Sequence, residues 1–403
     1  MAGRGVMFQN VYGRLAVAFG HLFPNWGSEV HPTRRIDTSW WRGLPPASAR
    51  EGWFAGSQRN SLGSVRVYLC MAKQDVNVRE APRMKAAVSW SRAVRIQDVE
   101  KPFPKDDKVL VRIHAASVCA ADYRLKNMPF VIAWMVGLRK GRILGMELAG
   151  TVESVGKAVT RFGAGDQVFG GTGFQFGTHA EYACVPENRL ESKPVNMTFE
   201  EAAAVMFGGL TALCFLRSAN IRNGQNVLIY GASGSVGVFA VQLAKHFGAR
   251  VTGVCSTANL DLVKSLGADE VVDYTSEDFS RAGRVYDMIF DTVGKAGFSR
   301  GLKALKRGGP YVKIAPSGGL FSLLGDMPRE WWISITGAAK MVGGLPHPAP
   351  GDLALLKGLI EAGEVRTVID RRYSLAETAD AFRYAEAGHK KGHVVIVVTQ
   401  RPE

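Results

Sequence analysis

Two kinds of hydrophobic pattern follow one another along the chain from residue 84 onward. Residues 108–115 (KVLVRIHA) alternate apolar and polar positions, which predicts a half-buried strand. In residues 145–170, glycines break short strand-like runs about every ten residues. Short strands at this spacing predict a small β-barrel in the first part of the chain.

The second pattern consists of short apolar strands that alternate with helices. Thr198 followed by Glu201 forms a capping-box pattern, which predicts that a helix opens there and runs through EEAAAVMF. The apolar runs are residues 226–230, 250–255, 270–273, 286–290 and 311–314, and the helical patterns between them are residues 236–247, 260–266 and 302–306. This alternation is typical of an α/β domain with a doubly wound parallel sheet, covered by helices on both faces.

The end of the chain leaves this alternation. Residues 352–362 and 375–387 have the apolar periodicity of amphipathic helices, and residues 393–398 (HVVIVV) predict a strand. So short a segment has too small a core to fold alone. We therefore expect residues 341–403 to return to the first domain and complete it.

Residues 1–83 have neither pattern. The segment contains eleven Lys and Arg against five Asp and Glu, together with four tryptophans. It is either an organelle transit peptide, which is typically Arg-rich and acid-poor, or an extension preceding a translation start at Met84. We favour the second interpretation, because only composition supports targeting and MKAAV opens a strand. We expect the segment to be disordered or not native.

Composition narrows the function classes. A chain of 403 residues is too long for one ordinary core, so two or three domains are expected. No apolar run approaches the ~20 residues that span a bilayer. The five cysteines include no CxxC pair, which argues against disulfides and structural zinc. We expect a cytoplasmic protein, or one of an organelle matrix if residues 1–83 are a transit peptide.

The net charge of +14 raises the question of nucleic-acid binding. Part of this charge lies in residues 1–83, and the remainder is spread over the other 320 residues. A nucleic-acid site usually needs a clustered basic surface. The sequence contains no dense basic run with interleaved aromatic residues. We therefore expect neither nucleic acid nor membrane as a partner.

A glycine-rich turn separates the strand at residues 226–230 from the following helix. Strand, turn and helix in this order are the context of a dinucleotide-binding site. Glycines allow the backbone to approach a pyrophosphate, and the helix N-terminus supplies free N–H groups and a positive dipole end. The alternative is a plain tight turn. The predicted cofactor-binding residues of this turn are Gly231, Ala232, Ser233, Gly234, Ser235, Val236 and Gly237.

The next strand bears on the choice of dinucleotide. NAD sites usually carry an acid ~20 residues after the turn, which binds the ribose 2′-hydroxyl. Here the strand runs into Ser256 and Asn259, and the first acid after it is Asp261. Hydroxyl and amide groups suit a 2′-phosphate better than a carboxylate does, so we favour NADP(H). Lys264 and Tyr274 are further candidate contacts, unless they are only a solvated helix residue and a strand-end aromatic.

From Met84 to Val398 the chain resembles the medium-chain dehydrogenase/reductase superfamily. The matching segments are GMELAGTVESVG, GAGDQVFG, EEAAAVMFGGLTAL, GASGSVGVFAVQLAKHFGARVTGVCST, SLGADEVVDY, FDTVG and AGHKKGHVVIVV. The turn sequence is typical of the quinone oxidoreductase branch. The resemblance implies a GroES-like catalytic domain (residues 84–205, completed by 341–403) and a Rossmann domain (206–340), with catalysis between them. We also expect a homodimer.

The resemblance bears on metal binding. Zinc members of the superfamily hold their catalytic metal with a Cys, a His and a later Cys or Asp, and here those positions are Cys119, Met146 and Phe207. Catalytic zinc needs three protein ligands, so the resemblance implies no metal and a pocket-lining role for these residues. Ala121 stands where the zinc enzymes have the hydroxyl of their proton relay, which argues against alcohol oxidation.

Other residues correspond to substrate or cofactor positions of the family. Asp122, Tyr123 and Arg124 match the substrate-pocket segment, where Tyr123 or Arg124 would donate to an acceptor carbonyl. The alternative is an Asp–Arg pair that supports the loop. Thr211 corresponds to a residue near the nicotinamide, although a helix hydroxyl also commonly bonds its own backbone. Thr292 and Val293 match the strand end beside the cofactor ribose.

The sequence therefore predicts an NADPH-dependent reductase of a quinone or α,β-unsaturated carbonyl. In this reaction the cofactor carries the chemistry and the protein aligns the acceptor. No His or Glu stands out as a general acid, which leaves a non-catalytic NADPH-binding sensor or structural homologue as the alternative. A zinc alcohol dehydrogenase is a third and weaker hypothesis. Residues 321–344, with Trp331 and Trp332, are expected to shape the acceptor pocket or a subunit interface.

Overall fold

The structure is a computed structural model of the chain. It describes residues 81–90, 93–127, 141–281, 283, 285–314, 333 and 336–398. The predictions for residues 1–80 therefore lie outside the described residues. The same holds for Trp331 and Trp332.

The first part of the described chain forms antiparallel strands around the long strand β3 (Lys108–Val118). A seven-stranded sheet has the order β15-β16-β3-β5-β6-β8, with β7 also paired to β3, and a three-stranded sheet has the order β2-β1-β4. The strands from this part of the chain are β1 (Arg83–Trp90), β2 (Ala93–Glu100), β4 (Arg142–Ile143), β5 (Glu147–Val155), β6 (Gln167–Gly171), β7 (Tyr182–Pro186) and β8 (Leu190–Ser192). The barrel-like sheet predicted from the glycine spacing is present.

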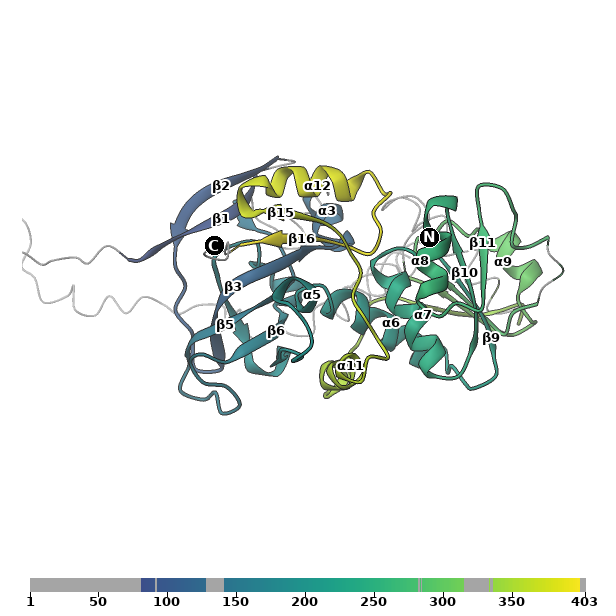
Figure 1. Cartoon of the computed structure of the whole chain (residues 1–403), viewed down its shortest axis with the longest axis horizontal. Coiled ribbons are helices and arrows are strands. Elements are labelled where there is room, and N and C mark those ends of the chain that lie inside the picture. The colour runs from purple at the N-terminus through teal and green to yellow at the C-terminus, as the bar shows by residue number, and fades with distance from the viewer. Residues whose placement is uncertain are drawn as a thin grey trace, which may run out of the picture. The chain divides into compact units, whose positions relative to one another are not determined.

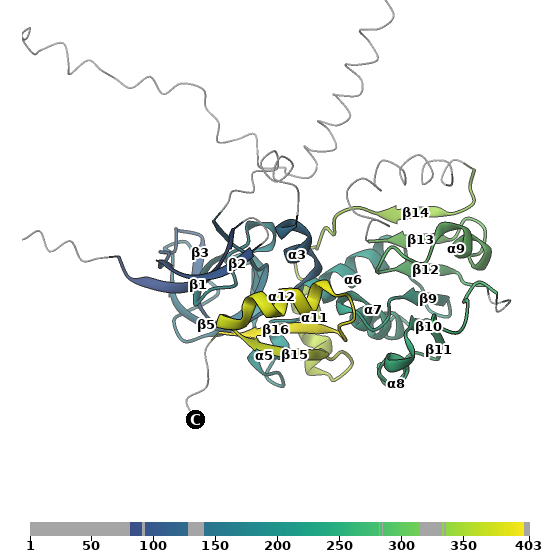
Figure 2. The same ribbon diagram turned by 90° about the horizontal axis from the view of Figure 1, so that it is seen from above.

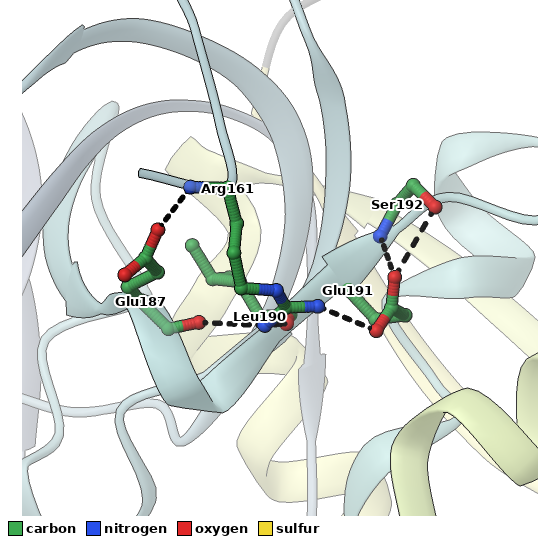
Figure 3. A network of polar contacts seen from close by, with 5 residues as sticks. All are labelled: Arg161, Glu187, Leu190, Glu191 and Ser192. Atoms are coloured by element: carbon green, nitrogen blue, oxygen red, sulfur yellow. Dashed lines mark hydrogen bonds and ion pairs between the residues drawn. The ribbon is translucent and has the colours of Figure 1, made fainter. Parts of the chain in front are cut away.

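A polar network joins the loop that follows β5 to the residues around β8 (Figure 3). The guanidinium of Arg161 donates to the carboxylate of Glu191 (2.8 Å) and to the carbonyl of Leu190 (3.2 Å), and its backbone N–H donates to Glu187. These bonds tie the loop after β5 to β8. The hollow of about 490 Å³ beside them is lined by Arg161, Phe162, Asp166, Gln167, Glu191 and Ser192. It contains none of the predicted site residues.

The second part is a six-stranded parallel sheet of order β11-β10-β9-β12-β13-β14 (Figure 2). Its strands are β9 (Asn226–Tyr230), β10 (Arg250–Cys255), β11 (Glu270–Asp273), β12 (Met288–Asp291), β13 (Pro310–Lys313) and β14 (Lys340–Gly343). Its helices are α6 (Met206–Ser218), α7 (Ser235–His246), α8 (Leu260–Ser265) and α9 (Phe298–Ala304). This arrangement confirms the predicted doubly wound α/β domain.

The chain then returns to the antiparallel part. After α11 (Asp352–Glu361) come β15 (Ile369–Ser374), α12 (Thr378–Glu386) and β16 (His393–Val397). Strand β16 pairs antiparallel with β3 and parallel with β15, and α12 lies over both (Figure 1). The last strand of the chain thus enters the same sheet as one of the first.

Two helices differ from their predicted extent. The helix predicted from Thr198 does begin with a capping box, but α5 (Phe199–Ala202) ends after one turn and α6 begins separately at Met206. The break leaves the backbone N–H of Phe207 free of an intrahelical partner, and it donates to the carboxylate of Glu147 (2.7 Å). Helix α9 begins four residues before the predicted helix 302–306 and ends at Ala304, because Leu305 leaves the helix and bridges to Tyr286.

Candidate cofactor and acceptor site

The turn between β9 and α7 is fixed by two glycines that no other residue could replace. Gly231 has a φ of +79°, and a Cβ there would lie 2.4 Å from Cγ2 of Val293. At Gly237 a Cβ would lie 2.1 Å from the carbonyl oxygen of Gly231. The turn therefore packs against the side chains that follow β12 at Gly231 and against its own backbone at Gly237.

Gly234 has a different reason to be glycine. Its φ is −83°, a conformation that other residues also adopt, so the backbone does not require glycine at this position. A Cβ there would meet only the carbonyl oxygen of Gly231, at 3.5 Å. Gly234 is the N-cap of α7, and the first N–H groups of a helix have no partner within it. Helix N-termini of this kind bind the pyrophosphate in dinucleotide sites, and Gly392 of the C-terminal part of the chain bridges to Gly234 beside it.

Polar side chains of the turn and of the end of β10 lie together. The amide nitrogen of Asn259 donates to the hydroxyls of Ser233 (3.1 Å) and Ser256 (3.2 Å). The Oδ1 atom of Asn259 is buried without a hydrogen-bond partner, which leaves an acceptor for a ligand hydroxyl. Tyr274 follows β11 and bonds through its N–H to the carbonyl of Cys255 (3.1 Å). The structure thus brings together four of the predicted nucleotide contacts.

An acid that the sequence analysis did not select also adjoins this region. Asp273 ends β11 beside Cys255, and its carboxylate accepts bonds from Thr257 and Thr275. The hydroxyl of Thr257 is the main cause that lowers the pKa of Asp273. The sequence offered a sign of this residue, because it is the acid that ends the strand EVVD, and the carboxyl ends of parallel strands lie at the same edge of a sheet. Lys264, by contrast, is exposed on α8.

The end of β12 packs against the glycine turn from the other side. The hydroxyl of Thr292 donates to the carbonyl of Tyr230 (2.9 Å), and Val293 covers Gly231. The buried carboxylate of Asp291 accepts three backbone N–H groups of the loop that follows, and burial raises its pKa. Thr211 is buried in α6. Asp291 therefore fixes the backbone of the predicted ribose edge.

A sulfur–aromatic cluster stands at the predicted acceptor position. It consists of Cys119, Met146 and Phe176, with Phe207 packed against them. The Sγ atom of Cys119 lies 3.8 Å from Sδ of Met146, and burial raises the pKa of the thiol well above its ordinary value. Phe176 was not selected from the sequence. Its φ of +59° is a strained conformation for a bulky residue, and such strain often occurs at functional sites.

Two carboxyl groups lie directly behind the cluster. Asp122 is fully buried and accepts the backbone N–H groups of Cys119 (2.8 Å) and Gly145 (3.1 Å), and burial raises its pKa. Glu147 is also fully buried, bonded to Ser117 and to the N–H of Phe207. Burial raises the pKa of Glu147 to about 7. An acid inside the apolar strand GMELAG was its signal in the sequence.

Comparison with known proteins gives the family. Residues 105–195 match the alcohol dehydrogenase GroES-like domain family, and residues 266–396 match a family described as zinc-binding dehydrogenase. A 2-methylene-furan-3-one reductase of Solanum lycopersicum is 34% identical over 74% of each chain. An NADPH-dependent alkenal/one oxidoreductase, chloroplastic, of Arabidopsis thaliana is 32% identical over 73% of each chain.

The chain belongs to the medium-chain dehydrogenase/reductase superfamily. The solved quinone oxidoreductase from Coxiella burnetii matches 79% of this chain and 100% of its own, with a TM-score of 0.71 and 28% identity. These relatives place the chain in the quinone oxidoreductase-like branch. It is a pyridine-nucleotide-dependent oxidoreductase, and in the described residues no helix combines the length and apolarity needed to cross a membrane.

Within this member of the superfamily, the two predicted donors lie on helix α3 (Ala120–Lys126). Leu125 packs against the sulfur–aromatic cluster, whereas Tyr123 packs with apolar residues that include Phe382 of α12. Arg124 is exposed, and Asp122 bonds to backbone groups. The role of Tyr123 and Arg124 stays a prediction.

Two lysines of the C-terminal return segment (residues 341–403) contact the region of the glycine turn at residues 231–237, which we call the nucleotide turn. Lys390 donates to Ser235 at the start of α7, and Lys391 donates to the carbonyl of Ala258 (3.3 Å). Neither lysine was predicted as a site residue, although the two stand next to each other in the sequence AGHKKGH. The pattern gave no sign that this segment would meet residues more than a hundred positions earlier.

Proposed function

We propose that this oxidoreductase transfers hydride from NADPH to a quinone or an α,β-unsaturated carbonyl compound. The observation that carries the proposal is the glycine turn at the N-terminus of α7, beside which the amide of Asn259 joins the hydroxyls of Ser233 and Ser256. Hydroxyl and amide groups tolerate a 2′-phosphate, whereas a carboxylate in their place would repel it. The reductases named above support the choice of acceptor class.

We further propose that no zinc takes part. Of the three ligand positions known in the zinc enzymes, only Cys119 offers a metal-binding group of the usual kind. Met146 offers a thioether and Phe207 offers none, and the Cys119 thiol is held protonated by burial. The residues present therefore do not fit a catalytic zinc ion. Elemental analysis of the purified protein should find no stoichiometric zinc, and a tightly held ion whose removal abolishes activity would contradict this.

The chain's own residues would position the acceptor and exclude water. When bound, the nicotinamide supplies the hydride. The sulfur–aromatic cluster offers an apolar surface on which a planar acceptor can stack or pack. The predicted donors Tyr123 and Arg124 would stabilise negative charge that develops on the acceptor oxygen, and solvent would deliver the proton.

The deciding experiment is an acceptor panel. NADPH oxidation is followed at 340 nm with quinones and enones of graded size, and binding is followed by fluorescence titration. Turnover with at least one class supports the proposal. Tight NADPH binding without turnover across the panel would favour the non-catalytic sensor instead.

Assembly and location are separate proposals. We propose a homodimer, which sedimentation velocity would test. We also propose a cytoplasmic location, or an organelle matrix if residues 1–83 act as a transit peptide. Expression of fluorescent fusions with and without residues 1–83 would decide between the two. The word chloroplastic in the name of the Arabidopsis relative favours testing both forms.

A further inference from the structure

The return segment between α12 and β16 lies directly against the nucleotide turn. The N–H of Gly392 donates to the carbonyl of Ser233 (2.8 Å), and the hydroxyl of Ser235 donates to the carbonyl of Gly392 (3.0 Å). Gly392 has a φ of +65°, and a Cβ there would lie 2.2 Å from the carbonyl oxygen of Val368. The backbone of this segment is therefore fixed beside the predicted pyrophosphate position.

Lys390 sits at the positive end of a helix. Its ammonium donates to the carbonyl of Gly392 (2.7 Å) and to the hydroxyl of Ser235, the first residue of α7. Burial lowers the pKa of Lys390 to about 8, so the ammonium still carries its charge at neutral pH. A cation beside a helix N-terminus is unfavourable unless anions offset it; the carboxyl groups of Glu147 and Asp370 favour the charge of Lys390, and a bound anion would do so further. The two positive groups together suit a pyrophosphate.

Lys391 reaches the other end of the nucleotide site. Its backbone N–H is held by the carboxylate of Asp370 (2.9 Å), and its ammonium donates to the carbonyl of Ala258 (3.3 Å). Ala258 is the middle residue of the turn Thr257–Asn259 that follows β10. The buried Oδ1 atom of Asn259 in this same turn has no partner. A cation, hydroxyls and a free acceptor thus adjoin the predicted position of the adenosine ribose, together with the carboxylate of Asp273, which accepts a bond from Thr257.

We propose that these two neighbouring lysines each bind a different phosphate group of the cofactor. Lys390 binds the pyrophosphate, which NADH and NADPH share, and Lys391 binds the 2′-phosphate, which only NADPH carries. The preference for NADPH then comes from the return segment as well as from the turn after β10. This inference rests on the proposed function, and it makes Lys391 rather than Lys264 the cation that discriminates.

The experiment compares three substitutions by titration of the full-length protein with NADPH and NADH. K391Q should weaken NADPH binding about ten- to fiftyfold and leave NADH binding nearly unchanged, because only the 2′-phosphate loses a cation. K390Q should weaken both cofactors by a similar factor, of about tenfold. K303Q, which removes an exposed lysine from α9, is the matched control and should change neither.

Two further measurements keep the proposal open to refutation. Lys390→Arg should restore much of the affinity that K390Q loses, since it restores the cation. Raising ionic strength should reduce the NADPH preference of the wild type and should affect K391Q less, because salt screens an exposed ion pair. Melting without cofactor checks that each variant is folded.

The outcomes separate the two proposals. A wild type that binds NADH as tightly as NADPH would remove the proposed cofactor choice itself. A wild type that prefers NADPH, together with a K391Q variant that keeps the preference, would overturn the role of Lys391 alone. Loss of the preference in K264Q instead would assign the 2′-phosphate to α8. A K390Q variant with unchanged affinity for both cofactors would overturn the role of Lys390.

Discussion

The nucleotide turn and the sulfur–aromatic cluster are held in place by different parts of the chain. The turn depends on close backbone approach, because Gly231 and Gly237 allow contacts that any side chain would prevent. In the cluster, side chains from separate elements meet over buried carboxyl groups, as Met146 and Phe207 do in front of Glu147. A site built from backbone contacts requires glycines at fixed spacings, which can be recognised in the sequence. A site built from side chains requires only ordinary apolar and acidic residues, which also occur at many other positions.

Gly237→Ala should give the largest effect. The added Cβ would lie 2.1 Å from one carbonyl oxygen and 2.8 Å from the backbone of Ala232, and neither can move without opening the turn. We expect a loss of about 3–5 kcal/mol in the free energy of unfolding. Chemical denaturation measures it. A variant as stable as the wild type would contradict the backbone packing described for the turn.

Gly234→Val is the matched variant that leaves the fold intact. The φ of −83° suits valine, and the Cβ would make only an ordinary contact of 3.5 Å with the carbonyl oxygen of Gly231, so the melting temperature should change little. Affinity for NADPH should fall about a thousandfold, because the branched side chain fills the predicted pyrophosphate position. Fluorescence titration and thermal melting together give the result. A folded variant with unchanged affinity would move the pyrophosphate site elsewhere.

Glu147→Gln tests the buried acid behind the cluster through pH. The pKa of Glu147 rises from its ordinary 4.5 to about 7 in the folded protein. The folded state therefore binds the additional proton across that window, and stability falls as the pH rises from about 4.5 to 7. The full change is about 3 kcal/mol. Denaturation at several pH values should show that E147Q lacks this decline, and an identical decline in E147Q would assign it to other groups.

Ser256→Asp tests whether residue 256 faces the 2′ position of the adenosine ribose. A carboxylate near a 2′-phosphate adds repulsion, so NADPH binding should weaken by about ten- to a hundredfold. The same carboxylate can accept a bond from a free 2′-hydroxyl, so NADH binding should hold or improve. Titration of wild type and variant with both cofactors measures the switch. An equal change for both cofactors would mean that residue 256 does not face the 2′ position.

The difference between the turn and the cluster also explains which features of the two sites could be predicted from the sequence. Local constraints were visible, because the glycines of the turn, the capping box at Thr198 and the alternating strands depend on near neighbours. Contacts between distant segments were not. Lys391 meets Ala258 only because the return segment crosses the turn, and Phe176 meets Met146 only in the folded barrel. Glu147 was readable as an acid in an apolar strand, but its burial and its partners required the structure.

We propose above that the protein reduces an electron-poor carbon with NADPH and without a metal. The most direct measurement is the steady-state rate of NADPH oxidation with an enone and a quinone, after treatment with a strong chelator, set beside the same assay with NADH. We expect turnover that survives chelation, with a higher kcat/KM for NADPH than for NADH. Activity that is lost on chelation and restored by zinc, or an equal kcat/KM for the two cofactors, would contradict it.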